Sequence, residues 1–551
     1  MVTLPCFSWC PKICSPNGHA IFWICFFFFF FFGCAIVGGI WLGVWLCKSK
    51  GQVAPSDDED PNCRFSKAAV AADSENCSEI GKDILRKNGS AVDAAIAALL
   101  CTSIMNPQCM GIGGGVIFTV MDSSGKVKII TSRETVPSNV TSDLLKSCPN
   151  TTDKWIGVPG EIRGYEAAHR LYGKLPWADL FQPTIKLARE GFPIPYYQGQ
   201  HIPHKNGNLL KTGDTVKFEK LADTLEMIAN EGPDVFYNGT IAKNLISDIQ
   251  DAGGNLTRKD LELYEAKVTD AWNISLGEYK LYFPPPPSGG AILSLILNIM
   301  KGYKMNSEPK TTDEKILFYH RYIEALKFAN ELKTNISDPN FSSDEMAKKL
   351  TQDSFADSKR SLISSDKTRD PGINLYLDSI GTTHVSVLAE DGSAVSVTSS
   401  INDEFGSGVL SPSTGIILNN QLSDFCGRAN SFSPGKRSRP PSNMAPSVLK
   451  SPSKTLVIGG SGSETIPPAV ASALMNHLWF GKSLKEAIIT PVVLVDSKIS
   501  LLFALQDVVD GLEALGHKIA KFYNTVNAVE KAGSCISAWS DERKKGKAAG
   551  Y

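Results

Sequence analysis

The chain has 551 residues, of which 42% are hydrophobic, and its formal net charge at pH 7 is -1. This length allows three or four domains, or one large α/β unit with a sizeable core. The near-neutral charge gives no reason to expect nucleic acid as a partner.

The N-terminal region contains a long uncharged segment, residues 21–47, with seven consecutive phenylalanines at Phe26–Phe32. About 20 apolar residues cross a bilayer core, so this segment is predicted to be a transmembrane signal-anchor. Residues 1–20 would then be a cytoplasmic tail and residues 48–62 a stalk. A cleaved secretory signal is the alternative, although its apolar region usually has about 7–15 residues. The flanking lysines, one before the segment and two after it, weakly favour the opposite orientation.

Glycosylation sequons indicate which side of the membrane the body occupies. Nine of them follow the apolar segment, at Asn76, Asn88, Asn139, Asn150, Asn238, Asn255, Asn273, Asn335 and Asn340. A single sequon often occurs by chance, but nine on the same side of the apolar segment favour an extracellular or lumenal body. The predicted location is therefore the cell membrane, in a single-pass type II topology with the active site outside.

The globular part begins near Cys63 and contains seven cysteines. This number is small for a disulfide scaffold, so a hydrophobic core must carry the fold. Because seven is odd, at least one thiol is free or paired with another chain. Residues 90–103 have apolar side chains at helical spacing and predict a buried helix. The glycine-rich Gly111–Gly115 follows, and then two predicted strands, Val116–Met121 and Val127–Thr131.

The predicted secondary structure changes along the rest of the chain. Residues 162–350 are mostly helical in pattern, whereas strands and glycine-rich turns alternate from Thr382 onward. The Pro-, Ser- and Arg-rich residues 431–446 predict a loop. We find no internal repeat.

Two alternating β-branched segments, residues 383–389 and 394–400, predict a hairpin. A three-residue loop at Glu390–Gly392, with glycine in the left-handed last position, places Thr382 opposite Ser400. A two-residue Asp-Gly loop would instead place Ile401 there. A threonine hydroxyl needs a base to become a nucleophile, and a threonine at a new N-terminus can use its own α-amine. Nothing in this local pattern shows that the chain is cut.

The segment that begins at Gly381 closely resembles the start of the small subunit of γ-glutamyltransferases, which are N-terminal-nucleophile hydrolases. The likeness covers about residues 66–551, with separate motifs in the right order: Ser90–Leu100, Met110–Gly115, Arg133-Glu134, Val158–Tyr165, Leu175–Trp177, Phe181–Pro183, Tyr319–Arg321, Gly381–Val395, Thr398–Asn402, Ser411-Pro412, Gly415–Asn420 and Asp424-Phe425.

The resemblance implies a fold and a reaction. The fold class is α/β (α+β), a four-layer αββα sandwich. The precursor would be cleaved before Thr382 into a large subunit, residues 63–381, and a small subunit, residues 382–551, which stay associated as a heterodimer. Thr382 would attack the γ-carbonyl of glutathione or another γ-glutamyl compound, and water, an amino acid or a dipeptide would accept the group.

The resemblance also assigns roles to individual residues. Thr382 is the nucleophile, Ser400 orients its hydroxyl, and the backbone N–H groups of Gly462 and Ser463 stabilise the oxyanion. The residues expected to bind the donor are Arg133, Ser400, Asn402, Gln421, Asp424, Ser442, Asn443 and Ser463. Arg133 would bind the α-carboxylate, and Asp424 would provide the negative charge for the α-ammonium. Cys77 and Cys101 match a family disulfide. No cofactor and no metal are expected.

Four residues depart from the family's usual pattern: Ser400, Gln421, Asn443 and Ser463. A positive φ at Ser463 would be strained, since glycine is usual there. These departures leave open a second hypothesis, a catalytically weak or silent homologue that acts as a surface glycoprotein. A third hypothesis keeps the nucleophile but restricts the donor to glutathione conjugates. His384 is predicted to have a structural role, because the amine of Thr382 already provides a base.

Overall fold

The computed structural model describes residues 63–148, 153–194, 210–369, 381–490, 494–495, 506–517, 519–520 and 525–551. Residues Met1–Pro61 and Asn62–Tyr551 form two separate units. The predicted tail, signal-anchor and stalk lie outside the described residues. Within the described part of the chain, no helix is long and apolar enough to cross a membrane.

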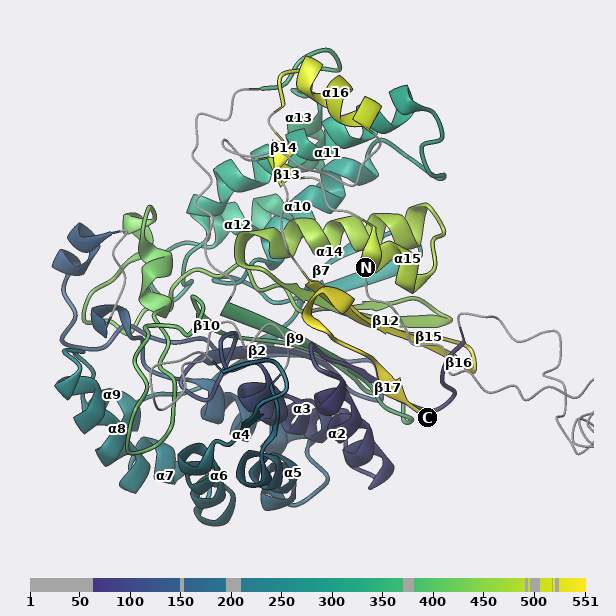
Figure 1. The fold of residues 1–551 in the computed structure, drawn as a ribbon. Coiled ribbons are helices and arrows are strands. Elements are labelled where there is room, and N and C mark those ends of the chain that lie inside the picture. The colour runs from purple at the N-terminus through teal and green to yellow at the C-terminus, as the bar shows by residue number, and fades with distance from the viewer. Residues whose placement is uncertain are drawn as a thin grey trace, which may run out of the picture. The chain divides into compact units, whose positions relative to one another are not determined.

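Two antiparallel sheets form the centre of the described body (Figure 1). The seven-stranded sheet has the order β17 (Ala549–Gly550), β1 (Ala69–Ala71), β9 (Gly381–Leu388), β10 (Ala394–Asn402), β2 (Gly115–Met121), β3 (Val127–Ser132) and β6 (Lys267–Asp270). The six-stranded sheet has the order β16 (Cys535–Ser540), β15 (Thr525–Ala532), β12 (Lys454–Ser461), β11 (Ser447–Lys450), β8 (Tyr279–Phe283) and β7 (Trp272–Leu276). Two short pairs lie apart, β4 (Phe192–Pro193) with β5 (Thr215–Val216), and β13 (Leu494–Val495) with β14 (Ile519–Ala520).

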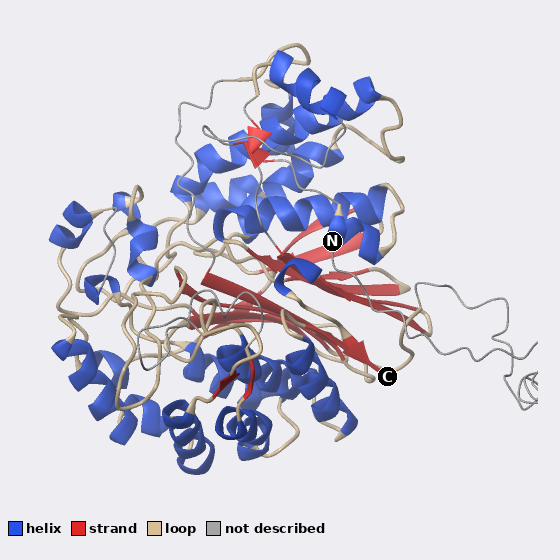
Figure 2. Cartoon of the chain, in the orientation of Figure 1, coloured by secondary structure: helices blue, strands red, loops and turns tan. Residues whose placement is uncertain are grey.

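Helices cover the outer face of each sheet (Figure 2). On the seven-stranded sheet these are α2 (Glu75–Arg86), α3 (Ala91–Met105), α4 (Glu161–Tyr172), α5 (Trp177–Glu190) and α6 (Glu219–Glu231), with α7 (Asp234–Tyr237), α8 (Thr240–Asp251) and α9 (Arg258–Glu262) beside them. On the six-stranded sheet they are α10 (Gly290–Lys301), α11 (Thr312–Leu332), α14 (Ile466–Leu474) and α15 (Leu484–Ile489), with α12 (Glu345–Leu350), α13 (Asp353–Arg360) and α16 (Gln506–Ala514) further out. Apolar side chains of both sheets, including Leu388 and Val457, pack together between them. The order of layers is helices, sheet, sheet, helices, as predicted.

The predicted helix at residues 90–103 is confirmed as α3. All its residues are buried, and apolar side chains lie on every face of the helix. Its N-terminus is closed by a capping box, in which Ser90 and Asp93 exchange side-chain and backbone hydrogen bonds. The helix packs beneath the seven-stranded sheet and supports the strands that carry the site.

The prediction of a mostly helical middle was incomplete, because residues 267–283 form the strands β6, β7 and β8. The side chains of β7 and β8 alternate between exposed and buried, the two-residue period of a sheet with one covered face. Gly277, with φ +64°, closes the turn between them. This short alternation was missed within a long stretch of helical pattern.

Three disulfides are present among the described cysteines. They join Cys77 to Cys101, Cys148 to Cys426, and Cys63 to Cys535, and they leave Cys109 as a buried thiol. The first is the pair that the resemblance implies. The other two connect segments on opposite sides of residue 381.

Candidate active site

The β9–β10 hairpin has the predicted three-residue register. Ala394 pairs with Leu388 and Ser400 with Thr382. The N–H groups of Ala389 and Gly392 donate to the carbonyls of Ser393 and Ala389, which leaves residues 390–392 as the loop. Gly392 has φ +82°, as the left-handed loop position requires. The alternative register, with Ile401 opposite Thr382, is therefore excluded.

Thr382 is held at the start of β9 by its cross-strand neighbour. Its Oγ1 lies 3.1 Å from Ser400 Oγ, and Ser400 donates its single hydroxyl proton to the carbonyl of Gly381 at 2.7 Å. Ser400 Oγ therefore accepts from the Thr382 hydroxyl, and it also accepts from the Asn402 N–H at 2.9 Å. This chain of hydrogen bonds orients the Thr382 hydroxyl. It also polarises the carbonyl of Gly381, which belongs to the Gly381–Thr382 peptide bond.

A pocket opens directly onto this threonine. Its lining includes nine of the ten residues that the resemblance assigns to the site: Arg133, Thr382, Ser400, Asn402, Gln421, Asp424, Ser442, Asn443 and Ser463. Gly462, the tenth, precedes Ser463 in the chain. The pocket thus brings together the end of β3, the hairpin, the loop after β10 and the turn after β12.

The polar wall of the pocket is organised around Arg133, which is only 1% exposed. Its Nη2 is ion-paired with Asp424 Oδ2 and donates to the carbonyl of Pro441 at 3.0 Å. Gln421 Nε2 donates to the same Asp424 oxygen at 2.9 Å. Burial raises the pKa of the adjacent Glu134 to about 7, although the nearby guanidinium opposes this effect. At neutral pH Glu134 is therefore only about half ionised, so this carboxyl, 3.8 Å from Arg133 Nη1, offsets only part of the charge that Arg133 presents to the pocket.

The remaining polar residues come from two loops. Asn402, with φ +77°, donates from Nδ2 to Ser423 Oγ at 2.6 Å. Ser442 Oγ accepts from the Met444 N–H at 3.1 Å, and the Ser442 N–H donates to the carbonyl of Pro287 at 2.7 Å. The Pro-rich segment after β8 therefore supports the loop that carries Ser442 and Asn443.

Gly462 and Ser463 form a left-handed turn between β12 and the helical segment that leads into α14. Their φ angles are +119° and +53°. The predicted strain is therefore present at Ser463, since a side chain rarely adopts this conformation. Consecutive N–H groups in such a turn form a concave donor site for an anion, the arrangement needed to stabilise an oxyanion.

His384 does not contact Thr382. It is fully buried, and its ring nitrogens lie 2.9 Å from Thr398 Oγ1 and 3.0 Å from Ser386 Oγ. Burial lowers the pKa of His384 to about 3, so the ring is neutral at physiological pH. A Cβ at Gly459 would lie 2.2 Å from its Cε1, so a glycine there makes room for the ring. The geometry supports a structural role.

Several residues around Thr382 were missed in the sequence. Lys544 Nζ donates to the carbonyl of Thr382 at 2.6 Å, and Asp73 Oδ2 accepts from the Thr383 hydroxyl at 2.7 Å. Met444 and Ile466 add apolar lining to the pocket. Lys544 and Asp73 are 471 positions apart, and neither lies in a local pattern that indicates a site.

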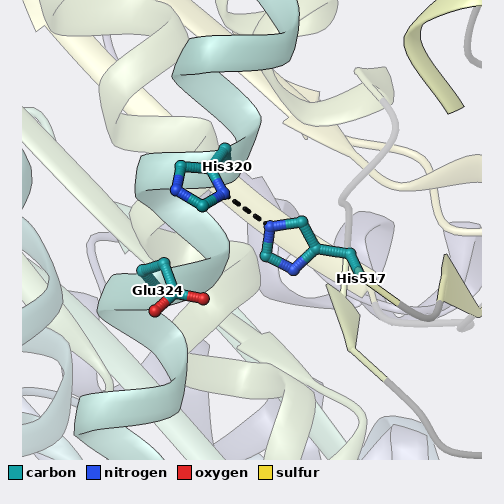
Figure 3. A group of neighbouring side chains, drawn as sticks. All are labelled: His320, Glu324 and His517. Atoms are coloured by element: carbon teal, nitrogen blue, oxygen red, sulfur yellow. Dashed lines mark hydrogen bonds between the residues drawn. The ribbon is translucent and has the colours of Figure 1, made fainter. Parts of the chain in front are cut away.

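Among the described residues, one group brings metal-type donors close together: His320, Glu324 and His517 (Figure 3). His320 Nε2 donates to the Ser364 carbonyl at 2.7 Å, which leaves its Nδ1 to accept from His517 Nε2 at 2.7 Å. Buried Lys327 lies 3.1 Å from Glu324 Oε1 and already balances its charge. A divalent cation would add two uncompensated charges in a buried site, at a high desolvation cost. We interpret the group as a hydrogen-bonded link between α11 and the segment after α16.

Comparisons with known proteins cover almost the whole described body. Residues 77–551 match the family model described as Gamma-glutamyltranspeptidase. The chain is 42% identical over 564 residues to glutathione hydrolase 5 proenzyme of Mus musculus, covering 94% of this chain and 98% of that protein. The structure is similar to cephalosporin acylase from Bacillus halodurans, with a TM-score of 0.78 and 24% identity over 91% of this chain and 99% of that one.

A second solved structure is γ-glutamyltranspeptidase of Helicobacter pylori, with a TM-score of 0.51 and 25% identity. It covers 58% of this chain and 96% of that chain. The likeness to the acylase bears on the fold alone. The region matched by the family model contains every residue of the pocket described above.

Proposed function

The chain belongs to the γ-glutamyltranspeptidase family, and we propose on this premise that it is an autoprocessed enzyme that cleaves the γ-glutamyl bond of glutathione and glutathione conjugates. The single observation that carries the proposal is the position of Thr382. Its hydroxyl lies at the base of a pocket whose wall presents both a buried cation, Arg133, and an anion, Asp424. A γ-glutamyl group needs this combination, because its α-carbon bears a carboxylate and an ammonium.

The proposed reaction starts with cleavage of the Gly381–Thr382 peptide bond, which gives Thr382 a free α-amine. The Thr382 Oγ then attacks the γ-carbonyl carbon of the donor while the amine takes the hydroxyl proton. N–H groups of the Gly462–Ser463 turn stabilise the oxyanion. When the C–N bond breaks, the leaving amine receives the proton and a γ-glutamyl ester remains on Thr382.

The second half of the reaction regenerates the enzyme. Water, an amino acid or a dipeptide attacks the ester carbonyl, and the α-amine of Thr382 again accepts the proton of the attacking group. The Thr382 Oγ leaves and recovers a proton from the same amine. This two-step scheme predicts ping-pong kinetics. It needs no cofactor, since one residue provides both the nucleophile and the base.

For the cellular location we propose a type II membrane ectoenzyme with its catalytic body outside the cytoplasm. Eight of the nine sequon asparagines lie among the described residues, and all eight are exposed. The two disulfides that cross residue 381 add support, because disulfides persist in oxidising compartments. Enzymatic removal of N-linked glycans from protein expressed in animal cells should increase its mobility on a gel. Unchanged mobility would contradict this location.

A reducing, denaturing gel and a γ-glutamyl hydrolysis assay test the enzymatic proposal together. The parent should yield two chains, with the smaller one beginning at Thr382, and should release glutamate from glutathione. Thr382→Ala should remain a single chain and be inactive. Thr383→Ser is a matched control, since its hydroxyl bonds to Asp73 rather than facing the pocket. A parent that stays uncleaved and inactive would favour the silent surface glycoprotein instead.

A further inference from the structure

Lys544 joins the three parts of the chain that meet behind the nucleophile. It is the last residue of a short 3₁₀ helix, Glu542–Lys544, and its side chain is 16% exposed. Its Nζ donates to the carbonyl of Thr382 at 2.6 Å and to Ser461 Oγ at 2.7 Å. It also lies 3.3 Å from Asp73 Oδ2, just after β1. One ammonium therefore ties the nucleophile to the strand that leads into the Gly462–Ser463 turn and to the large subunit.

This position puts a positive charge close to the group that must act as the base. The nitrogen and the carbonyl oxygen of one residue are separated by only two atoms, so covalent geometry limits their distance to about 3.6 Å. The Lys544 ammonium is therefore within about 6 Å of the Thr382 nitrogen. A cation at this range disfavours the protonated form of an amine. An unperturbed α-amine is roughly half protonated near pH 8, and only its neutral form can accept the hydroxyl proton.

We propose that Lys544 is a positioning residue that fixes the backbone of Thr382 and keeps the new α-amine unprotonated, so that it can act as the base at neutral pH. This inference rests on the proposed function, because it assigns the base to the amine created by cleavage. It adds a residue from the C-terminal end of the chain to the catalytic arrangement.

The other charged and titratable groups near Thr382 do not cancel this effect. The Asp73 carboxylate accepts from the Thr383 hydroxyl and from Asn527 Nδ2, and it is ion-paired with the Lys544 ammonium itself. Across the pocket, Arg133 and Asp424 form an ion pair with each other. His384 is neutral because burial lowers its pKa.

Cys109 is close to Lys544, Asp73 and Glu404. Burial is the main cause that raises the pKa of its thiol, so the thiol is neutral at physiological pH. Glu404 is a further carboxylate near this thiol. Lys544 is in direct contact with the Thr382 backbone, which makes it the dominant charge at the amine.

The test compares kcat/KM of the processed, full-length enzyme with a γ-glutamyl anilide from pH 5.5 to 9. Lys544→Met keeps most of the side-chain volume but removes the charge. The acidic limb of the pH profile, where kcat/KM rises as the amine loses its proton, should therefore move to higher pH by about one unit. Lys544→Arg keeps the charge, and its limb should stay where it is in the parent. Lys547→Met is the matched control, since Lys547 is exposed and pairs with Glu75.

The shape of the profile separates charge from structure. A loss of activity in Lys544→Met that is equal at every pH, with the limb unmoved, would overturn the proposal. If Lys544→Met stays uncleaved, Asp73→Asn provides the test instead. Removing that carboxylate should move the acidic limb of the kcat/KM profile to lower pH. An unmoved limb in Asp73→Asn would then refute the role of charge. A parent without γ-glutamyl activity would instead refute the proposed function.

Discussion

The guanidinium of Arg133 is ion-paired with the carboxylate of Asp424, although the two are 291 positions apart. The family resemblance assigns these side chains to opposite ends of the donor's amino-acid group. Without a donor, each satisfies the charge of the other. A bound γ-glutamyl group offers a carboxylate and an ammonium in their place, so binding exchanges one internal ion pair for two intermolecular ones.

Asp424→Asn should weaken donor binding more than it slows the chemical step. The amide cannot balance the α-ammonium, and charge-assisted hydrogen bonds are worth about 1.5–3 kcal/mol, so KM should rise roughly 10–100-fold. Steady-state kinetics with a γ-glutamyl anilide provide the measurement. A glutaryl anilide, which lacks the ammonium, is the control substrate and should be hydrolysed by parent and variant at similar rates. An equal loss for both substrates would show that Asp424 acts only by holding Arg133.

Ser463→Gly should relieve the left-handed strain at this position without loss of the oxyanion donor. The backbone N–H remains, so kcat should stay within about two-fold of the parent. Ser463→Ala keeps the strain and removes the hydroxyl, and it should be less stable than Ser463→Gly by about 1 kcal/mol. Chemical denaturation gives the stability difference. If both variants lose activity to the same extent, the hydroxyl, rather than the N–H alone, takes part in the reaction.

The disulfides predict that the two processed chains stay covalently joined. Cys63 and Cys148 precede the proposed cleavage site, whereas their partners Cys535 and Cys426 follow it. A non-reducing gel of mature protein should therefore show one species of full mass, which separates into two after reduction. Two chains without reductant would mean that neither bond forms.

The Cys148–Cys426 disulfide should also affect the donor site. Cys426 directly follows the short helical turn Gln421–Phe425, which carries two of the residues expected to bind the donor. The double variant Cys148→Ser, Cys426→Ser should raise KM several-fold, because this turn loses its covalent tie, with a smaller effect on kcat. The pair Cys77→Ser, Cys101→Ser is the control, since that bond links α2 to α3 outside the pocket.

Glu161→Gln should change how stability depends on pH. Burial raises the pKa of Glu161 from 4.5 to about 8, so the folded state holds a proton that the unfolded chain releases. The contribution of Glu161 to stability is therefore complete below about pH 4.5 and is lost as pH rises through about 8. The amide cannot ionise, so the parent should lose more stability between pH 5.5 and 8.5 than the variant. Thermal unfolding of parent and variant at these two pH values checks this. An equal loss of stability in the two proteins would contradict it.

Patterns within a few residues determined much of what the sequence could predict. The β9–β10 hairpin follows from alternating side chains and one glycine in a tight loop, so the sequence alone favoured Ser400 as the residue opposite Thr382 and left Ile401 as the alternative, which the structure excludes. The buried helix α3 follows in the same way from apolar side chains at helical spacing. In such segments covalent neighbours restrict the backbone, and the period of the side chains shows which face is covered. The roles of Arg133 and Asp424 came from resemblance, since no local pattern distinguishes them from surface residues.

Only the tertiary structure decided which distant residues meet. The ion pair between Arg133 and Asp424, the ammonium of Lys544 on the Thr382 carbonyl and the disulfides across residue 381 all join segments that are far apart in the chain. The strands β6–β8 were missed because their short alternation gains meaning only when a neighbouring sheet covers one face. Such contacts arise from the packing of two sheets and their helices, a cooperative property of the whole body, and a local stretch of sequence therefore does not specify them.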